Sequence, residues 1–579
     1  MSVYADRQRV IESRAISEVE TLLRSRGFKK RSDRCFSRIL DVDGTRIPIR
    51  LVIPARYPSS LPEVFVVDRG ALPRRIPHVE ATGKLCPLPN TGILADSSRP
   101  GAVASEILDR TEGLLQDGLS GSNEQDFVAE FQAYWNAQDI CGFIDFIAKV
   151  GPPSREVMLV SYKPHGSSSS RYVAADTVRA ARRWLKNQDL TYLAAERGSL
   201  FHLNRPFIPP DYDQVLQIEE VMDAVRSGSP PAMFNSFLWG WARRSEPFTI
   251  LVALPIMSDC NWSVCAIRVV PKARTALAEG GKIEEHPPAR LRSHVQKLRV
   301  RRCDPSYLLS RTGVSDRMQD KTVLVIGCGA IGSLLAVHLS SMGIARLLLV
   351  DPDMLKADNV HRHALGFQHV GAPKAKALRD ELQSRYPHLD FDYREARFED
   401  ILEAEPHLLT EVDLVVVGVG EETIELLLNE VCRFDVPRIH SWVDPLGLGG
   451  HVLVIPPDSG AACYRCLFTE DSELGLHNRA SFVAPGQEIQ QTYAGCAGYF
   501  TPFSYQDCDQ TAIYAAKLAL ESLTGELNTS TELLSWFGSS TEARGRGVNL
   551  SKRVHLFEPG QTQRLEIRKE SSCLCGNWR

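Results

Sequence analysis

The most regular run of apolar residues lies between positions 322 and 350. Residues 322–326 are mostly β-branched, as expected for a strand buried on both faces of a parallel sheet. A helical stretch then runs to about Met342, and Gly343 ends it. Residues 346–350 form a second apolar run, which places Asp351 at its carboxyl end. The pattern predicts a strand, a helix and a parallel strand in one α/β sheet.

The first 150 residues carry a different pattern. Apolar residues recur at near-helical spacing over positions 4–26, up to Gly27. Two strand-like runs, 35–40 and 46–53, flank an Asp-Gly turn, and helical stretches follow near 103–117 and 125–136. We therefore expect an α+β domain over residues 1–150.

The middle of the chain, residues 151–303, predicts an α/β domain without a catalytic constellation. Strand-like runs occur at 157–161, 249–254 and 263–270, and a helical stretch at 176–186. His202 and Asp211 are interpreted as ordinary surface residues. The basic run at 290–302 lacks interleaved aromatic residues, so we predict a solvated linker helix there and no nucleic-acid partner.

Composition narrows the class of protein. The chain has 579 residues, 43% of them hydrophobic, which suits about three domains. Its 67 basic and 71 acidic residues give a net charge of −4, which argues against a general polyanion binder. The charged N-terminal stretch has no apolar core, so we expect no secretion signal and no membrane attachment. The 14 cysteines predict reduced thiols and metal ligands in a bacterial cytoplasm.

Three glycines follow the first strand of the 322–350 unit. Gly327, Gly329 and Gly332 have G-x-G-x-x-G spacing, which allows a tight turn and brings phosphates close to a helix N-terminus. Asp351 is then within reach of a ribose hydroxyl. These glycines interrupt the apolar run, which excludes a transmembrane helix. A nicotinamide or flavin dehydrogenase is a rival interpretation of the same motif.

Residues after Asp351 favour a triphosphate over a dinucleotide. Asn359, Arg362 and Lys374 offer an amide, a guanidinium and an ammonium near the sheet edge. With the glycines, this order resembles the Rossmann-like adenylation domains of ubiquitin-activating and ThiF/MoeB-type enzymes. The resemblance implies ATP-dependent adenylation of a protein's C-terminal carboxylate over residues 304–579. It assigns Asp351 to the ribose, Asn359 and Arg362 to the phosphates, and Lys374 to the developing charge.

The same resemblance leaves two positions open. Gly420 stands where the family places a Mg²⁺-binding acid, and Glu421 or Glu422 are the alternatives. The family also supplies an arginine to the partner's ATP across a homodimer interface. Arg311 is preferred for this role over Arg317.

Two cysteine pairs predict a structural Zn²⁺ site. Cys463 and Cys466 form a C-x-x-C pair, and Cys573 and Cys575 form a C-x-C pair. Four thiolates satisfy tetrahedral zinc with no open position, so the ion would tie the C-terminal segment to the sheet. The alternative is free thiols near the C-terminus.

A nucleophilic cysteine is expected between the two pairs. Cys496 matches the place of the family's catalytic cysteine, in a crossover segment before a long helix. Cys508 is the alternative, because it lies near the expected start of the helix at 510–523, whose dipole lowers a thiol pKa. Asp507 and Asp509 oppose that effect, and Cys496 is favoured.

The first domain resembles the ubiquitin-conjugating fold. The order of helix, meander, a Tyr-Pro segment and a His eight residues before a Cys carries this resemblance, which makes Cys86 the thioester-bearing cysteine. His78 falls in the family's His-Pro-Asn region, but Val79 follows it in place of Pro-Asn. The oxyanion donor is therefore missing, and Asn90 is a candidate by proximity. The alternative for Cys86 is a buried core thiol.

Together the ends of the chain resemble bacterial fusion proteins of type II CBASS anti-phage systems. The resemblance implies a relay in which the adenylated carboxylate passes to Cys496, then Cys86, then a target amine. It also implies that the conjugated protein is a cGAS-like (CD-NTase) nucleotidyltransferase, and that the activating domains form homodimers. A ThiF/MoeB-like sulfur-transfer adenylase and a noncatalytic scaffold are the alternatives.

Overall fold

Two compact units make up the chain in the computed structural model. The first contains residues 1–161, 171–176 and 194–301, and the second contains residues 162–170, 177–193 and 302–579. The structure describes residues 2–87, 96–137, 142–212, 218–230, 234–235, 246–256, 262–271, 293–310, 316–431, 436–457, 460–487, 489–492, 499–527, 529–570 and 573.

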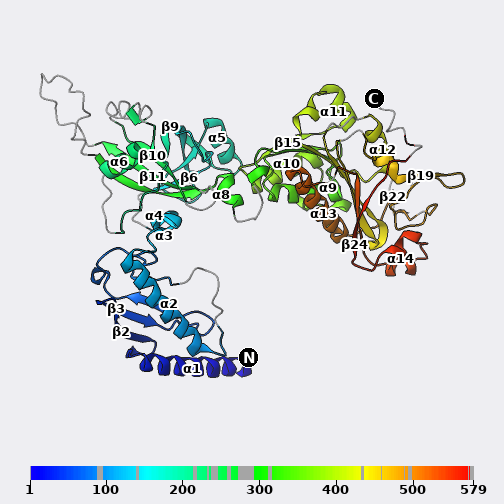
Figure 1. The fold of residues 1–579 in the computed structure, drawn as a ribbon. Coiled ribbons are helices and arrows are strands. Elements are labelled where there is room, and N and C mark those ends of the chain that lie inside the picture. The colour runs from blue at the N-terminus through cyan, green and yellow to red at the C-terminus, as the bar shows by residue number, and fades with distance from the viewer. Residues whose placement is uncertain are drawn as a thin grey trace, which may run out of the picture. The chain divides into compact units, whose positions relative to one another are not determined.

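An antiparallel sheet and two long helices begin the first unit (Figure 1). The strands are β1 (Lys29–Ser32), β2 (Cys35–Val42), β3 (Thr45–Val52), β4 (Glu63–Val66) and β5 (Lys84–Leu85), paired in that order. Helices α1 (Ser2–Ser25) and α2 (Pro100–Ser120) pack on one another and share a core with the sheet. Helix α1, strands β2 and β3 about the Asp-Gly turn, and helix α2 agree with the elements that the sequence pattern predicted.

A closed seven-stranded barrel follows, in the order β10-β11-β12-β6-β8-β7-β9. Its strands are β6 (Gly142–Phe146), β7 (Arg155–Lys163), β8 (Arg171–Ala175), β9 (Thr191–His202), β10 (Phe248–Pro255), β11 (Trp262–Pro271) and β12 (Ser293–Arg302). Among the described residues, this part of the chain also has the helices α3 (Asp126–Ala129), α4 (Phe131–Asn136), α5 (Val178–Lys186) and α6 (Ile218–Gly228). Alternate residues of β10 enter two different apolar clusters, as the two-residue period of a strand requires. The barrel begins at β6, before position 151.

Two interpretations of the middle region were wrong. The basic run forms strand β12, which pairs with β11, and no linker helix forms. Barrel closure explains why this segment is a strand, because pairing with β11 satisfies the backbone N–H and C=O groups of β12. Lys297 is buried in this strand. His202 is also buried, and burial lowers its pKa to about 4.

The second unit contains an eight-stranded sheet of order β15-β14-β13-β16-β17-β18-β23-β24. The strands are β13 (Thr322–Ile326), β14 (Arg346–Val350), β15 (Asp390–Arg394), β16 (Leu414–Val417), β17 (Arg438–Asp444), β18 (Gly449–Ile455), β23 (Glu532–Phe537) and β24 (Thr562–Glu566). The first five strands of that order run parallel, and β18, β23 and β24 continue the sheet with antiparallel pairing.

Helices cover both faces of this sheet. Alternate residues of β13 face opposite sides: Val323 and Val325 pack with α9 (Ala330–Ser341), α10 (Lys374–Arg385) and α13 (Tyr505–Thr524). Leu324 and Ile326 pack with α11 (Phe398–Ala404) and α12 (Glu422–Val431). The result is a three-layer Rossmann-like fold, which confirms the predicted α/β class. Among the helices that the structure describes, none is long and apolar enough to cross a membrane.

Candidate active sites and metal centre

The glycine motif forms the turn between β13 and α9. Gly327 has a φ of 85°, which favours glycine, and a Cβ on Gly332 would lie 1.8 Å from the carbonyl oxygen of Gly327. A Cβ on Gly329 would meet no atom within 4 Å. Gly332 therefore allows helix and turn to pack closely, while Gly329 faces open space at the start of α9. The turn fits a nucleotide phosphate at a helix N-terminus.

Asp351 closes the turn from the end of β14. Its Oδ2 accepts a hydrogen bond from the backbone N–H of Cys328 at 2.7 Å, and its Oδ1 accepts one from Asp353 at 2.8 Å. Burial raises the pKa of this carboxyl. Each carboxylate oxygen can accept a second hydrogen bond, so the geometry suits a ribose hydroxyl.

Lys374 lies beside Asp351 and Asp353. Its Nζ is 2.8 Å from Oδ2 of Asp353, and its backbone N–H also donates to the Asp353 carbonyl. The structure thus places Asp351 and Lys374 near the carboxyl end of β14, as their positions in the sequence predicted.

Asn359 and Arg362 have local partners in this structure. Oδ1 of Asn359 accepts a hydrogen bond from the Lys356 backbone N–H at 3.2 Å. The Arg362 guanidinium carbon lies 4.8 Å from the ring centre of Phe503. A phosphate contact from either residue stays a prediction.

Around Gly420, a buried acid that sequence reasoning missed holds the loop. The Gly420 backbone N–H donates to Oε1 of Glu425 at 3.1 Å, and Oε2 of Glu425 lies 2.9 Å from Nδ1 of His440. Glu422 accepts a hydrogen bond from Asn478 at 3.0 Å. Glu425 follows Gly420 by five residues on α12, and no sequence motif singles it out.

Cys508 is a buried thiol within the first turns of α13. It is fully buried, and burial together with the charge of Asp507 raises its pKa to about 12. The helix dipole therefore does not produce a reactive thiolate there. Cys496 and Arg311 lie outside the described residues, and Arg317 lies in the short 3-10 helix 316–318.

Three cysteines converge at the end of the second unit. Sγ of Cys463 lies 3.9 Å from Sγ of Cys466 and 3.6 Å from Sγ of Cys573. Zn–S bonds of about 2.3 Å in tetrahedral geometry hold the sulfurs roughly 3.8 Å apart, so the set fits zinc. The hydrogen bond with Cys466 lowers the pKa of Cys463, which favours a ligating thiolate. The predicted fourth ligand, Cys575, lies outside the described residues.

In the first unit, Cys86 ends a short hairpin. Val79 bridges Leu85, and the Cys86 backbone N–H donates to the His78 carbonyl at 2.9 Å. The Cys86 thiol is partly exposed and donates to Oε1 of Glu80 at 3.5 Å. Partial burial of the Cys86 thiol, and after it the negative charge of Glu80, raise the pKa of Cys86 to about 11. Asn90 lies outside the described residues.

His78 is held by two carboxylates, those of Asp126 at the start of α3 and of Glu130 between α3 and α4. Its Nε2 lies 3.1 Å from Asp126 Oδ2, and its Nδ1 lies 3.3 Å from Glu130 Oε2. The hydrogen bond with Glu130 raises the pKa of His78, and Asp126 adds to that effect. The His78 backbone N–H also donates to the Tyr134 hydroxyl at 2.7 Å. His78 therefore anchors the hairpin that carries Cys86, and its side chain is not directed at the thiol.

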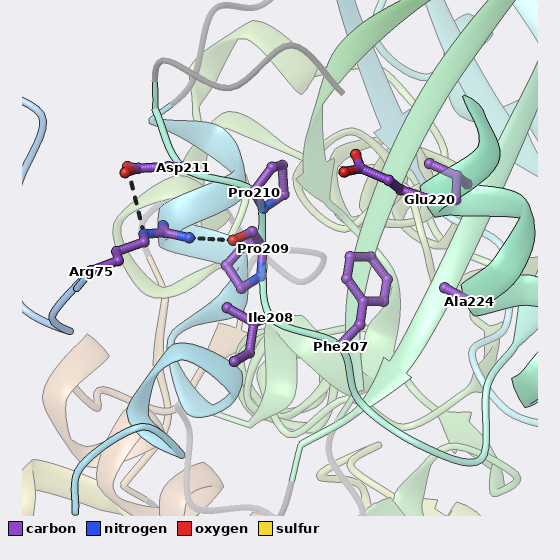
Figure 2. A pocket seen from close by; sticks show the side chains of 9 residues that line it. Arg75, Phe207, Ile208, Pro209, Pro210, Asp211, Glu220 and Ala224 are labelled. Carbon is purple, nitrogen blue, oxygen red and sulfur yellow. Dashed lines mark hydrogen bonds and ion pairs between the residues drawn. The ribbon is translucent and has the colours of Figure 1, made fainter. Parts of the chain in front are cut away.

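Arg75 links the segment before His78 to residues 207–212. Its guanidinium donates to the Pro209 carbonyl, and its Nε lies 3.6 Å from Asp211 Oδ1 (Figure 2). A cavity of about 480 Å³ lies beside this link, with Phe207 and Glu220 in its wall (Figure 2). Asp211 also pairs with Arg69 at 2.6 Å, and its side chain stays 38% exposed.

Comparison with known families matches both ends of the chain. Residues 306–536 match the ThiF family model, and residues 16–140 match the model of prokaryotic E2 family B. The first match covers the strand–turn–helix that carries Gly327 and Asp351, and the second covers the hairpin that carries Cys86.

Two relatives match most of this chain. The chain is 24% identical over 485 residues to the ATP-dependent ubiquitin transferase-like protein Cap2 of Pseudomonas aeruginosa (strain BWHPSA011 / Pa011), with 80% of this chain and 83% of that protein covered. The protein of that name from Escherichia coli (strain TW11681) is 24% identical, with 82% and 84% covered. The SAMP-activating enzyme E1 of Haloferax volcanii is 30% identical, covering 28% of this chain and 57% of its own length.

Proposed function

We propose that this chain, a fusion of a prokaryotic E2-like domain with a ThiF-type E1-like domain, ligates the C-terminal carboxylate of a protein to a target amine at the expense of ATP. One observation carries the proposal. A nucleotide-type turn with Asp351 and Lys374 occurs in the same chain as Cys86, a partly exposed cysteine on an E2-like hairpin. An adenylating enzyme without a transfer step would have no use for the second feature.

The first step is acyl adenylate formation in the second unit. The turn around Gly329 receives the phosphates, Asp351 binds the ribose, and Lys374 stabilises the charge that develops as pyrophosphate leaves. Asn359 and Arg362 turn from their local partners to the phosphates. Mg²⁺ would shield the triphosphate, and Glu422, the first residue of α12 and two positions after Gly420, is a candidate ligand.

Two thioester steps follow. Cys496 attacks the acyl adenylate and releases AMP, and Cys86 then receives the acyl group by thioester exchange. Each covalent step divides a difficult amide synthesis into easier exchanges. The low reactivity expected of a buried thiol at Cys508 supports Cys496 as the first nucleophile.

The partners are proposed from the family resemblance. The conjugated protein is a cGAS-like nucleotidyltransferase of an anti-phage system, and a homodimer brings Arg311 of each chain to the other chain's ATP. A zinc ion on Cys463, Cys466, Cys573 and Cys575 ties the C-terminal segment to the sheet and takes no part in the reaction. The protein acts in the bacterial cytoplasm.

The test uses the full chain with Cys86→Ser, which converts a labile thioester into a slowly hydrolysing oxyester. The variant is purified from cells that express the host's cGAS-like nucleotidyltransferase, and its peptides are analysed by mass spectrometry. We expect an adduct at position 86 that disappears in the double variant with Cys496→Ala and persists with Cys35→Ser as the control.

Other outcomes identify the alternatives. ATP–pyrophosphate exchange with the partner carboxylate but without an adduct at position 86 contradicts the relay and indicates a sulfur-transfer type of adenylase. Absence of both ATP–pyrophosphate exchange and the adduct would contradict any enzymatic activity of this chain and would indicate a noncatalytic scaffold.

A further inference from the structure

We propose that Glu80 is the proton acceptor for aminolysis of the acyl thioester on Cys86. This inference rests on the proposed function, because it requires an acyl group on Cys86. It adds a catalytic residue at the position where the conjugating family has an asparagine, two residues after His78.

The hairpin geometry fixes the distance between the two side chains. The Glu80 backbone N–H donates to the Lys84 carbonyl at 2.8 Å, and the Gly83 N–H donates to the Glu80 carbonyl at 2.9 Å. Gly83 has a φ of 79°, and a Cβ there would lie 2.3 Å from the Val66 carbonyl oxygen, so the turn is held against β4. In this register Glu80 lies opposite Lys84 and Cys86 lies opposite His78, so Glu80 and Cys86 are diagonal neighbours, with Oε1 at 3.5 Å from Sγ.

The carboxylate is accessible. Glu80 is exposed, and among the described residues no lysine or arginine forms an ion pair with it. Lys84, the nearest lysine in sequence, directs its Nζ to Glu63 at 2.6 Å. Glu63 is thus paired with Lys84, and two further carboxylates near the hairpin, Asp126 and Glu130, are in contact with His78. Glu80 is therefore the acid positioned to receive a proton beside the thioester.

The chemistry balances through this carboxylate. The amine nitrogen attacks the thioester carbonyl carbon, and as the C–N bond forms the nitrogen becomes cationic and acidic. Glu80 accepts that proton, the C–S bond breaks, and Sγ leaves as a thiolate. Glu80 then returns the proton to Sγ, which gives the Sγ–H to Oε1 hydrogen bond seen in this structure. The raised pKa of Cys86 favours this last transfer.

The experiment bypasses adenylation so that it separates this inference from the proposed function. The full chain is loaded at Cys86 with a synthetic acetyl-Gly-Gly thioester, and loading is confirmed by peptide mapping against Cys86→Ser. Release of the acyl group is then followed with free lysine and, separately, with dithiothreitol. Dithiothreitol attacks as a thiolate and has no ammonium proton to lose.

We expect E80Q to load as the unmodified chain does, to release the acyl group to lysine about 100-fold more slowly, and to release it to dithiothreitol at an unchanged rate. E80D should retain part of the lysine reaction. E124Q, which removes the same charge from an exposed pair with Arg74, is the matched control and should change neither rate.

Two results would overturn the inference. An equal loss with both nucleophiles would show that Glu80 only shapes the hairpin, and an unchanged lysine rate would show that another group takes the proton. Failure of the chain to load Cys86 from ATP, with normal behaviour of the chemically loaded thioester, would count against the proposed function alone.

Discussion

The sulfur atoms of Cys463 and Cys573 lie 3.6 Å apart, although 110 residues separate them in the chain. This distance is too long for a disulfide and matches two ligands of one tetrahedral zinc ion. The segment after β24 is thereby brought to the segment after β18, on the antiparallel side of the sheet.

Substitution of Cys466 by Ser should remove zinc from the protein. We expect about one zinc ion per chain before the change and none after it, measured by elemental mass spectrometry. Loss of a cross-link over a loop of this length should destabilise the C-terminal segment by roughly 2–5 kcal/mol, by analogy with a disulfide. Hydrogen exchange in residues 562–570 reports that effect. Cys35→Ser is the control, and zinc retention in C466S would contradict the site.

The glycine turn offers a matched pair of variants. In Gly332→Ala the new methyl group would meet the Gly327 carbonyl, so the second unit should lose about 3 kcal/mol of stability. In Gly329→Ala the methyl group meets open space, so the fold should persist while ATP binding weakens at least tenfold. Thermal unfolding and nucleotide binding by calorimetry separate the two effects. Equal ATP affinity in G329A and the unmodified chain would place the phosphates elsewhere.

Cys508→Ala should leave thioester formation within twofold of the unmodified rate. Its thiol is buried and has a pKa of about 12, so little thiolate exists at neutral pH. The measurement is ATP-dependent thioester on the full chain, detected as an adduct that is sensitive to dithiothreitol. Loss of the adduct in C508A but not in C496A would reverse the assignment of the nucleophile.

The His78–Glu130 contact should make the stability of the first unit depend on pH. The pKa of His78 is raised, so its contribution is complete below the unfolded value of about 6.5 and is lost as pH rises through the folded value. The pKa of Glu130 is lowered, so its contribution is present above its ordinary value and is lost as pH falls. Urea denaturation from pH 5 to 9 should show stability falling at the alkaline end. That fall should be absent in His78→Gln, and parallel profiles for the two proteins would contradict the prediction.

Arg75→Met should release residues 207–212. The change removes a hydrogen bond to Pro209 and the ion pair with Asp211, while the methionine retains the apolar stem. We expect faster hydrogen exchange in this segment, corresponding to roughly 1–3 kcal/mol. Arg74→Met, at an exposed pair with Glu124, is the control and should not alter exchange there. Unchanged exchange in R75M would show that the apolar contacts alone hold the segment.

The sequence by itself determined the elements whose signals are local. Apolar strands, the glycine spacing and the positions of Asp351 and Lys374 follow one another within about 50 residues, and the strand–turn–helix geometry fixes where their side chains meet. The Cys-x-x-C spacing likewise predicted that the sulfur atoms of Cys463 and Cys466 lie close together, because a short turn places both on one side; they are 3.9 Å apart.

Only the tertiary structure decided the relationships that depend on closure and long-range packing. The basic strand β12 has no period that distinguishes it from an exposed helix, and barrel closure selected the strand. Helix position made Cys508 the alternative nucleophile, but packing of α13 on the sheet buried it. Glu80 had only its place after His78 as a signal, and the hairpin register brought it to Cys86. Burial and proximity arise from contacts between segments, and the local pattern of residues does not encode them.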